Sequence, residues 1–248
     1  MKTEWDYTGL ADAYLKRPDY SDTAIDAMVR IAGLTGGKAC DIGAGVGHLT
    51  LMLLRRGFEV TAVEPNAAMR RNGMARTAGM ANIRWVVGTG EESGQPAEAS
   101  DLVTFGSSFN VTDQPAALRE TARILKPRGW FACMWNHRRL DDPIQRTIEE
   151  TIKSILPDYT YGRRREDQSV VIRESALFGD VIHLDAEVVH RQSVEDCIEA
   201  WKSHATLARQ AKERFGSIVD RIAHYLTSLS TPSIDVPYVT NIWMARRA

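Results

Sequence analysis

Three closely spaced glycines, Gly43, Gly45 and Gly47, lie between a predicted strand and a predicted helix. A turn built of small residues lets the backbone come close to a ligand at the start of a helix. The next predicted strand ends on Glu64, an acid whose carboxylate suits the two hydroxyls of a ribose. The glycine turn and this acid together predict a nucleoside-binding site.

Asp41 narrows the class of nucleoside, because it stands two residues before the first glycine. A dinucleotide fingerprint reads G-x-G-x-x-G and seats a pyrophosphate at the helix start, whereas Gly47 comes one residue too early for that pattern. An acidic side chain at this place disfavours a pyrophosphate and suits a cationic or zwitterionic ligand. An NAD-dependent oxidoreductase therefore remains only as an alternative interpretation.

The segment from Asp41 to Gly47 resembles motif I of the class I S-adenosylmethionine-dependent methyltransferases, whose signature is E/D-x-G-x-G-x-G. The resemblance covers about residues 35–135 and is to the broad type-11 group, which includes trans-aconitate and quinone-precursor enzymes. It implies S-adenosylmethionine as the cofactor. Further family landmarks follow in order: Thr89-Gly90-Glu91 after a strand-like run, a fourth strand over 100–106, and a helix and turn over 118–129 in which Arg128 replaces a glycine.

The resemblance also implies which residues hold that cofactor. In similar proteins the acid that corresponds to Glu64 meets the ribose hydroxyls, and the glycine turn surrounds the methionine portion. An aromatic-x-x-Arg-Pro element, here Tyr14 and Arg17, approaches the cofactor carboxylate, although packing against the core is an equal alternative for Tyr14. The implied cofactor-binding residues are Tyr14, Arg17, Asp41, Gly43, Ala44, Gly45, Glu64, Pro65, Met69, Thr89, Gly90, Glu91, Phe105 and Gly106.

Two histidines and one asparagine are the candidates for handling the methyl acceptor. His137 follows the predicted fifth strand and is the first choice of general base or orienting residue, since the pKa of a free histidine lies near neutral pH. A solvated loop histidine is the alternative. His204, on a predicted lid helix, is the second choice, with packing against the core as its alternative. Asn110 could orient a substrate by hydrogen bonding, but it cannot act as a base.

The run Arg163-Arg164-Arg165 could bind a carboxylate or phosphate of the acceptor, because guanidinium groups pair with such anions bidentately. In that case the acceptor is acidic. The alternative is a solvated face on which these arginines pair with Glu166 and Asp167.

Composition and charge limit the partners. The 248 residues are 44% hydrophobic and 25% charged, and the net charge of -1 gives no general attraction to nucleic acid or an anionic membrane. The separated Cys40, Cys133 and Cys197 predict no disulfide framework, and the six histidines lack metal-ligand spacing, so no metal is expected. Residues 1–7 lack the apolar core of a secretion signal, and no stretch suits a membrane span, so a cytoplasmic location is expected.

Strands and helices alternate from Lys38 to Trp135, which predicts an α/β fold with a parallel sheet covered by helices on both faces. The ligand should lie at the carboxyl ends of the strands. The resemblance implies a Rossmann-like sheet of seven mostly parallel strands, with the last strand antiparallel and inserted between the fifth and sixth. Outside the alternating part we expect helices over 8–16, 21–33 and 143–156, a polar loop over 157–170, a strand over 181–190, two lid helices over 194–211 and 214–229, and a last strand over 238–245.

A single domain is expected, since no linker, repeat or low-complexity tract divides the chain. Its parts would be N-terminal helices that cover the cofactor site (1–34), the cofactor-binding core (35–140), and the rest of the sheet with a substrate-binding lid (141–248). The lid and the near-neutral charge favour a methyltransferase acting on N, O or C of a small molecule. An RNA or protein methyltransferase is a second alternative, and it would need a basic face across the lid. A non-catalytic module that binds the cofactor but lacks a competent acceptor pocket is the third.

Overall fold

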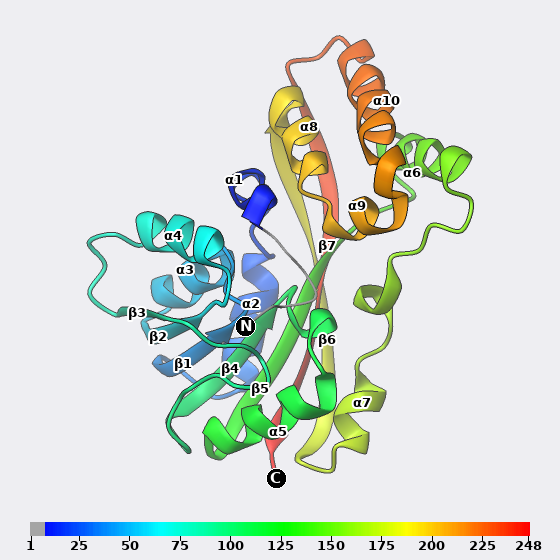
Figure 1. Cartoon of the computed structure of the whole chain (residues 1–248). Coiled ribbons are helices and arrows are strands. Elements are labelled where there is room, and N and C mark those ends of the chain that lie inside the picture. Colours follow the sequence, from blue (N-terminus) through cyan, green and yellow to red (C-terminus); the bar gives the residue numbers. More distant parts are fainter. Residues whose placement is uncertain (1–7) are drawn as a thin grey trace.

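Seven strands form one mixed sheet in the computed structural model, which describes residues 8–248 (Figure 1). In chain order they are β1 (Gly37–Ile42), β2 (Phe58–Val63), β3 (Ile83–Val86), β4 (Ser100–Gly106), β5 (Leu125–Arg138), β6 (Phe178–Ser193) and β7 (Ser233–Arg247). Their order in the sheet is β3-β2-β1-β4-β5-β7-β6; β7 runs antiparallel to both β5 and β6, and all other neighbouring pairs are parallel. The predicted α/β fold and the place of the last strand are confirmed.

Helices cover both faces of the sheet (Figure 1). On one face, Val103 and Phe105 of β4 pack beneath the helices that follow β4 and precede β6. On the other, Leu102 and Met134 pack beneath the helices that flank β1. Both faces of β4 are thus buried, as in other parallel sheets. The helices are α1 (Ala11–Tyr14), α2 (Asp22–Ile31), α3 (His48–Arg55), α4 (Ala67–Arg76), α5 (Gln114–Ile124), α6 (Pro143–Ile155), α7 (Ser169–Glu174), α8 (Val194–Lys202), α9 (Ala205–Ala211) and α10 (Phe215–Ser228).

A separate helical layer lies over one end of β6 and β7 (Figure 1). These strands continue to pair over Ser233–Pro237 of β7, beyond the end of β5. Helices α6, α8, α9 and α10 pack there around their own apolar cluster, which includes Ile152, Trp201 and Ile222. Three of these helices come between β6 and β7 in the sequence, where lid helices were predicted. We call the four helices the lid.

The lid differs from the prediction in its helix boundaries. The helix predicted over 194–211 is broken at Ser203 and His204. The cause is the His204 ring, whose Nδ1 accepts the backbone N–H of Leu207 at 3.2 Å and so caps a new helix, α9. The loop predicted over 157–170 is also partly ordered, because it contains a 3-10 turn, η3 (Gly162–Arg165), and the start of α7.

Helix α2 is anchored by contacts that its own sequence does not reveal. Ser21 precedes the helix, as predicted for a cap, but its hydroxyl donates to the carbonyl oxygen of Glu187 at 3.2 Å. Its backbone N–H donates to Oγ1 of Thr240 at 2.8 Å. These partners belong to β6 and β7, so α2 is held against the antiparallel part of the sheet.

Three further predictions concern a secretion signal, membrane-spanning helices, and metal or disulfide sites. Residues 1–7, which carry the secretion-signal prediction and begin the predicted 1–34 region, lie outside the described residues. No helix within 8–248 is both long and apolar enough to cross a bilayer. Over the same range, no three His, Cys, Asp or Glu side chains are grouped to hold a metal, and the three cysteines are buried free thiols.

Candidate functional site

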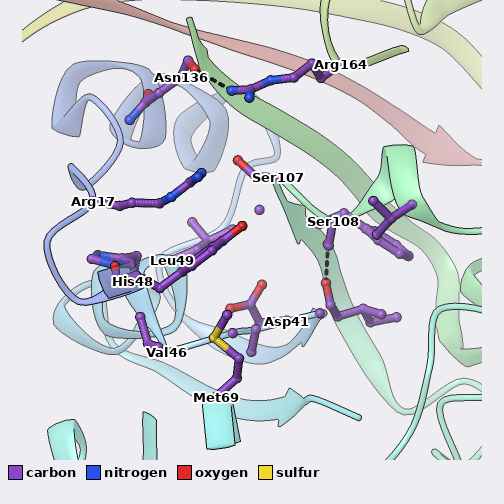
Figure 2. Close-up of a pocket in the computed structure, with 18 of the residues that line it drawn as sticks. Arg17, Asp41, Val46, His48, Leu49, Met69, Ser107, Ser108, Asn136 and Arg164 are labelled. Carbon is purple, nitrogen blue, oxygen red and sulfur yellow. Dashed lines mark hydrogen bonds between the residues drawn. The ribbon is translucent and has the colours of Figure 1, made fainter. Parts of the chain in front are cut away.

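A cavity lies at the carboxyl ends of β1, β2 and β4, between these strand ends and the lid (Figure 2). Every residue predicted to bind the cofactor lines it, from Tyr14 and Arg17 to Gly106. His137 and His204 line the cavity as well. The structure thus gathers these candidates around one space, while their contacts with a ligand stay predictions.

The turn after β1 requires glycine at its first position. Gly43 has a φ of +67°, and a Cβ on it would lie 2.4 Å from Cβ of Ser108. The N–H groups of Gly43 and Ala44 donate to the carbonyl oxygen of Val63 at 2.8 and 3.1 Å, which ties the turn to the end of β2. Gly45, with a φ of +57°, has no protein atom within 4 Å of a Cβ position. The backbone at Gly45 therefore faces open space that a ligand can enter.

Glu64 joins the end of β2 to the glycine turn. Its Oε2 accepts the N–H of Gly45 at 2.8 Å, and its Oε1 accepts the N–H of Asn66 at 2.8 Å. The residue is 6% exposed, and burial raises the pKa of its carboxyl against the opposing effect of the two N–H groups. A carboxylate oxygen has two lone pairs. Each oxygen of Glu64 therefore keeps the capacity to accept a ribose hydroxyl.

Asp41 is a second buried acid beside the turn. Its Oδ2 accepts the hydroxyl of Thr50 at 2.6 Å, and its Oδ1 accepts the hydroxyl of Thr104 at 3.0 Å. Burial raises the pKa of Asp41 to about 6, although both hydrogen bonds favour the ionised form. The two hydroxyls orient the carboxylate without neutralising it, so a cationic group nearby would be favoured. Asp41 and Glu64 together fit a zwitterionic sulfonium nucleoside better than a pyrophosphate.

Arg17 links the segment before α2 to the lid. Its Nε and Nη2 donate to the hydroxyl and carbonyl oxygens of Ser203 at 3.1 and 2.8 Å. Its guanidinium lies 4.1 Å from the centre of the Tyr14 ring. Tyr14 also packs against the cluster of Val46 and Met69 while lining the cavity. The Tyr14 side chain therefore packs against the protein, as the alternative predicts, and also lies where it could contact the cofactor.

Protein groups engage both ring nitrogens of His137. The Nε2 lies 2.7 Å from the carbonyl oxygen of Arg164, and the Nδ1 lies 3.3 Å from Nδ2 of Asn241. The ring donates to the carbonyl and accepts from the amide, which requires its neutral form. Burial and the positive charges of Arg164 and Arg165 lower the pKa of His137 to about 4. His137 is therefore neither a solvated loop residue nor, as placed here, a base with a free lone pair.

His204 is buried on the lid side of the cavity. Its ring stacks on Trp201 with the ring centres 5.2 Å apart. Burial, with the positive charges of Arg164 and Arg138, lowers the pKa of His204 well below its ordinary value. Because Nδ1 accepts the Leu207 N–H, the neutral ring carries its proton on Nε2. The ring can donate a hydrogen bond, but it has no lone pair for a substrate proton.

Asn110 does not line the cavity. Its Oδ1 accepts the indole N–H of Trp135 at 2.8 Å, and Trp135 is 1% exposed. A buried indole N–H needs such a partner. The predicted contact between Asn110 and the acceptor is therefore not supported, because its side-chain oxygen serves the core.

The arginines of the run 163–165 have three different environments. Arg163 is exposed and lies outside the cavity. Arg164 is half-buried and lines the cavity, with its Nη2 3.4 Å from the carbonyl oxygen of Asn136 (Figure 2). Arg165 is exposed, also lines the cavity, and donates to the carbonyl oxygen of Arg138 at 3.0 Å. The alternative of one solvated, self-paired face is therefore wrong for Arg164.

Several cavity residues were not predicted as site residues, and two of them, Arg138 and Ser107, bring polar groups to the cavity. Arg138 lines the cavity with its guanidinium 4.0 Å from the centre of the Trp201 ring. Ser107 lines it with its hydroxyl 2.9 Å from that of Tyr20. Each directly follows a predicted site residue at the carboxyl end of a strand. That position was the signal that could have identified them.

Sequence comparison matches residues 40–133 to a methyltransferase domain. An uncharacterized methyltransferase of Mycobacterium tuberculosis is 33% identical over 125 residues, which cover 49% of this chain and 48% of that protein. The ubiquinone/menaquinone biosynthesis C-methyltransferase UbiE of Rubrivivax gelatinosus is 34% identical over 109 residues, 43% of each chain. This chain thus spans about half, or less, of the length of the curated relatives it matches.

Solved structures share the fold over most of the chain. A candidate type II methyltransferase from Anaeromyxobacter dehalogenans has a TM-score of 0.65 at 19% identity, covering 93% of this chain and 97% of that one. Phosphoethanolamine N-methyltransferase 2 of Haemonchus contortus, solved with phosphomonomethylethanolamine and S-adenosylhomocysteine, has a TM-score of 0.56 at 16% identity, covering 99% of this chain and 58% of that one. The domain match over residues 40–133 and the shared fold support the resemblance of this chain to the class I S-adenosylmethionine-dependent methyltransferases.

Proposed function

We propose that this protein transfers a methyl group from S-adenosylmethionine to a small-molecule acceptor. The observation that carries the proposal is the hydrogen bond between Glu64 and Gly45, which joins the ribose-binding candidate and the glycine turn at one cavity. Asp41 adds a buried carboxylate that no protein cation neutralises among the residues described. Relatives named as ubiquinone/menaquinone biosynthesis methyltransferases support a small acceptor.

Different residues of this chain would bind S-adenosylmethionine and the acceptor. S-adenosylmethionine, when bound, supplies an electrophilic methyl group. Glu64 would hold its ribose hydroxyls, Asp41 and Gly45 its methionine portion, and Met69 its adenine. The protein then has to align the acceptor and exclude water, which are positional contributions to the rate. The lid, which closes one side of the cavity through Ala200 and His204, serves both purposes.

Proton removal by a histidine is not part of the proposal. The lone pair of neutral His137 accepts from Asn241, and that of His204 accepts from Leu207. We propose that transfer proceeds by positioning of an acceptor that is nucleophilic at N, O or C without a histidine base. His204 can assist by donating a hydrogen bond from Nε2.

The distribution of arginines favours a small acceptor over RNA or protein. A macromolecule would need exposed positive charge around the cavity entrance. Arg138, Arg164 and Arg165 instead line the cavity itself, and only Arg163 of the run is both exposed and outside it. Arg139, next along the chain, is paired with Asp141 at 2.5 Å and with Glu187.

Calorimetric titration with S-adenosylmethionine, S-adenosylhomocysteine and NADH tests the proposal. We expect both sulfur compounds to bind with one site per chain and NADH not to bind. Release of S-adenosylhomocysteine during a screen of metabolites then identifies the acceptor. Binding of NADH without either sulfur compound would overturn the proposed function.

A further inference from the structure

Four arginines line the cavity, and three of them, Arg17, Arg138 and Arg164, are partly buried, whereas Arg165 is exposed. Arg17, Arg138 and Arg164 come from the segment before α2, the end of β5 and η3, and all three line the cavity. Figure 2 shows Arg164 at the opposite end of the pocket from Met69, with Arg17 between them. Burial and the positive charges of Arg17 and Arg138 lower the pKa of Arg164, which indicates that both groups repel Arg164.

No acid within the described residues balances these charges. No ion pair there includes Arg17, Arg138 or Arg164. The acids that line the cavity, Glu64 and Glu91 among them, accept hydrogen bonds from hydroxyl or backbone N–H groups instead. Partly buried positive charge that lacks an ionic partner raises the free energy of the folded protein. A ligand that carries negative charge would remove this cost.

Arg138 and Arg164 also have donors that lack a partner. The Nε of each is sealed from solvent and has no hydrogen-bond partner. The guanidinium plane of Arg138 lies over the ring of Trp201 at 4.0 Å and near that of Tyr238 at 5.5 Å. Stacking engages the face of the group and leaves its N–H edge for an anion. Arg17 differs, because its Nε and Nη2 are already bonded to Ser203.

The two arginines are held in place by the protein. His137 donates to the carbonyl oxygen of Arg164 at 2.7 Å, and Arg165 donates to the carbonyl oxygen of Arg138 at 3.0 Å. These bonds join η3 to the end of β5 from both directions. The backbone of each arginine is therefore fixed, so less conformational entropy is lost when an anion binds.

We propose that Arg138 and Arg164 form an anion subsite that binds a carboxylate or phosphate group of the methyl acceptor. The inference rests on the proposed function, because it assigns to the acceptor the part of the cavity farthest from the adenine-binding candidate Met69. Arg17 is not part of this subsite, because it is predicted to bind the carboxylate of the cofactor. Carboxylate and phosphate share the chemistry that guanidinium edges recognise, which is two oxygens spaced for paired N–H donors.

The test measures anion binding to the protein saturated with S-adenosylhomocysteine. The probes are succinate, tricarballylate and inorganic phosphate at constant ionic strength, with neutral succinamide as the comparison. The variants are Arg138→Met and Arg164→Met. Arg163→Met is the matched control, because Arg163 is a neighbour in the same run but is exposed and outside the cavity.

We expect at least one anion to bind the wild type and succinamide not to bind. Affinity should fall about tenfold or more in Arg138→Met and Arg164→Met and stay within about twofold in Arg163→Met. Affinity for S-adenosylhomocysteine should be unchanged in all three. A preference for the carboxylates or for phosphate tells which anion the acceptor carries.

Thermal unfolding provides a second readout if a variant binds nothing. The anion should raise the melting temperature of the wild type but not of Arg164→Met. Without anion, Arg164→Met should melt no lower than the wild type, because the substitution removes repulsion. Anion binding that both Met variants retain, or no anion binding to the S-adenosylhomocysteine complex, overturns the subsite while the proposed function stands. Failure of the wild type to bind S-adenosylhomocysteine overturns the proposed function instead.

Discussion

His137 and Arg164 are joined by a hydrogen bond of 2.7 Å from the ring Nε2 to the backbone carbonyl oxygen. On the other side of the ring, Nδ1 accepts from Nδ2 of Asn241 at 3.3 Å. The histidine therefore connects η3 to both β5 and β7. We infer that His137, although it lines the cavity, acts on the acceptor by positioning Arg164.

Replacement of His137 by Ala should weaken acceptor binding and leave cofactor binding unchanged. One hydrogen bond of about 1 kcal/mol is lost, so the KM for the acceptor should rise about fivefold to tenfold at nearly constant kcat. His137→Gln keeps an N–H donor and should recover most of the loss. Steady-state kinetics check this expectation. A large fall in kcat that Gln does not rescue would show that His137 is a base.

The lowered pKa of His137 should make folding stability depend on pH. The pKa is about 4 in the folded protein against an ordinary value of 6.5. Between these values the unfolded chain binds a proton that the folded ring does not, so this contribution is complete above pH 6.5 and is lost as the pH falls toward 4. The loss is at most about 3 kcal/mol.

Denaturant unfolding measures this effect at about pH 7 and about pH 4.5. The wild type should lose more stability on acidification than His137→Gln, whose side chain does not titrate. His204 has a pKa lowered in the same direction, but it is present in both proteins and cancels. Equal losses in the two proteins contradict the assignment of a neutral His137.

Alanine at Gly43 should mainly lower the stability of the protein, whereas alanine at Gly45 should mainly lower its affinity for the cofactor. Gly43→Ala brings a Cβ to 2.4 Å from Cβ of Ser108 at a positive φ, so the free energy of unfolding should fall by about 2–4 kcal/mol. Gly45→Ala meets no protein atom within 4 Å and should cost about 1–2 kcal/mol. Its methyl group enters the ligand space, so affinity for S-adenosylhomocysteine should fall more than tenfold. Unchanged affinity in Gly45→Ala would place the ligand elsewhere.

Glu64→Gln should weaken S-adenosylhomocysteine binding by about 1–3 kcal/mol. The amide has one carbonyl oxygen in place of two carboxylate oxygens, so it cannot accept from Gly45, Asn66 and a ribose at once. Calorimetry gives the affinity. Glu59→Gln is the matched control, because Glu59 lies on the same strand but is exposed and outside the cavity. Equal affinities in both variants remove Glu64 from the site.

Asp41→Asn should raise the stability of the folded protein and lower its affinity for the cofactor product. The pKa of Asp41 is raised to about 6, so its ionised form costs folding free energy above that pH, and the cost disappears as the pH falls toward the ordinary value of 3.8. The Asn variant should therefore be about 1 kcal/mol more stable than the wild type at about pH 8. Its affinity for S-adenosylhomocysteine should fall about tenfold, because the ligand amino group loses a carboxylate. A variant that is less stable at that pH contradicts the pKa of Asp41.

The parallel part of the fold could be predicted because its signals are local. Gly43 and Gly45 mark the turn after β1, and Glu64 marks the end of the next strand. Asn66 caps α4 by accepting the N–H groups of Ala68 and Met69, a pattern that depends on neighbouring residues alone. The cofactor side of the cavity follows from these elements, because parallel strands end at one edge of the sheet.

The acceptor side depends on contacts between distant parts of the chain. Asn136 pairs with Thr240 across the β5–β7 ladder, and Arg164 comes from a segment whose polar composition predicts a loop. The engagement of His137 and His204 by neighbouring groups is likewise set by the folded backbone. Residue type alone indicated that these histidines could be bases, whereas their hydrogen bonds show that their lone pairs are used.

The two sides of the cavity are encoded by separate stretches of the chain. Apart from the segment before α2, the cofactor side comes from Asp41 to Gly106, and the acceptor side comes from Asn136 to Tyr238. Under the proposed function, substitutions in the second stretch should change which molecule is modified and leave the contacts of Asp41, Gly45 and Glu64 in place. The choice of acceptor can therefore change separately from the part of the chain that is proposed to hold the methyl donor.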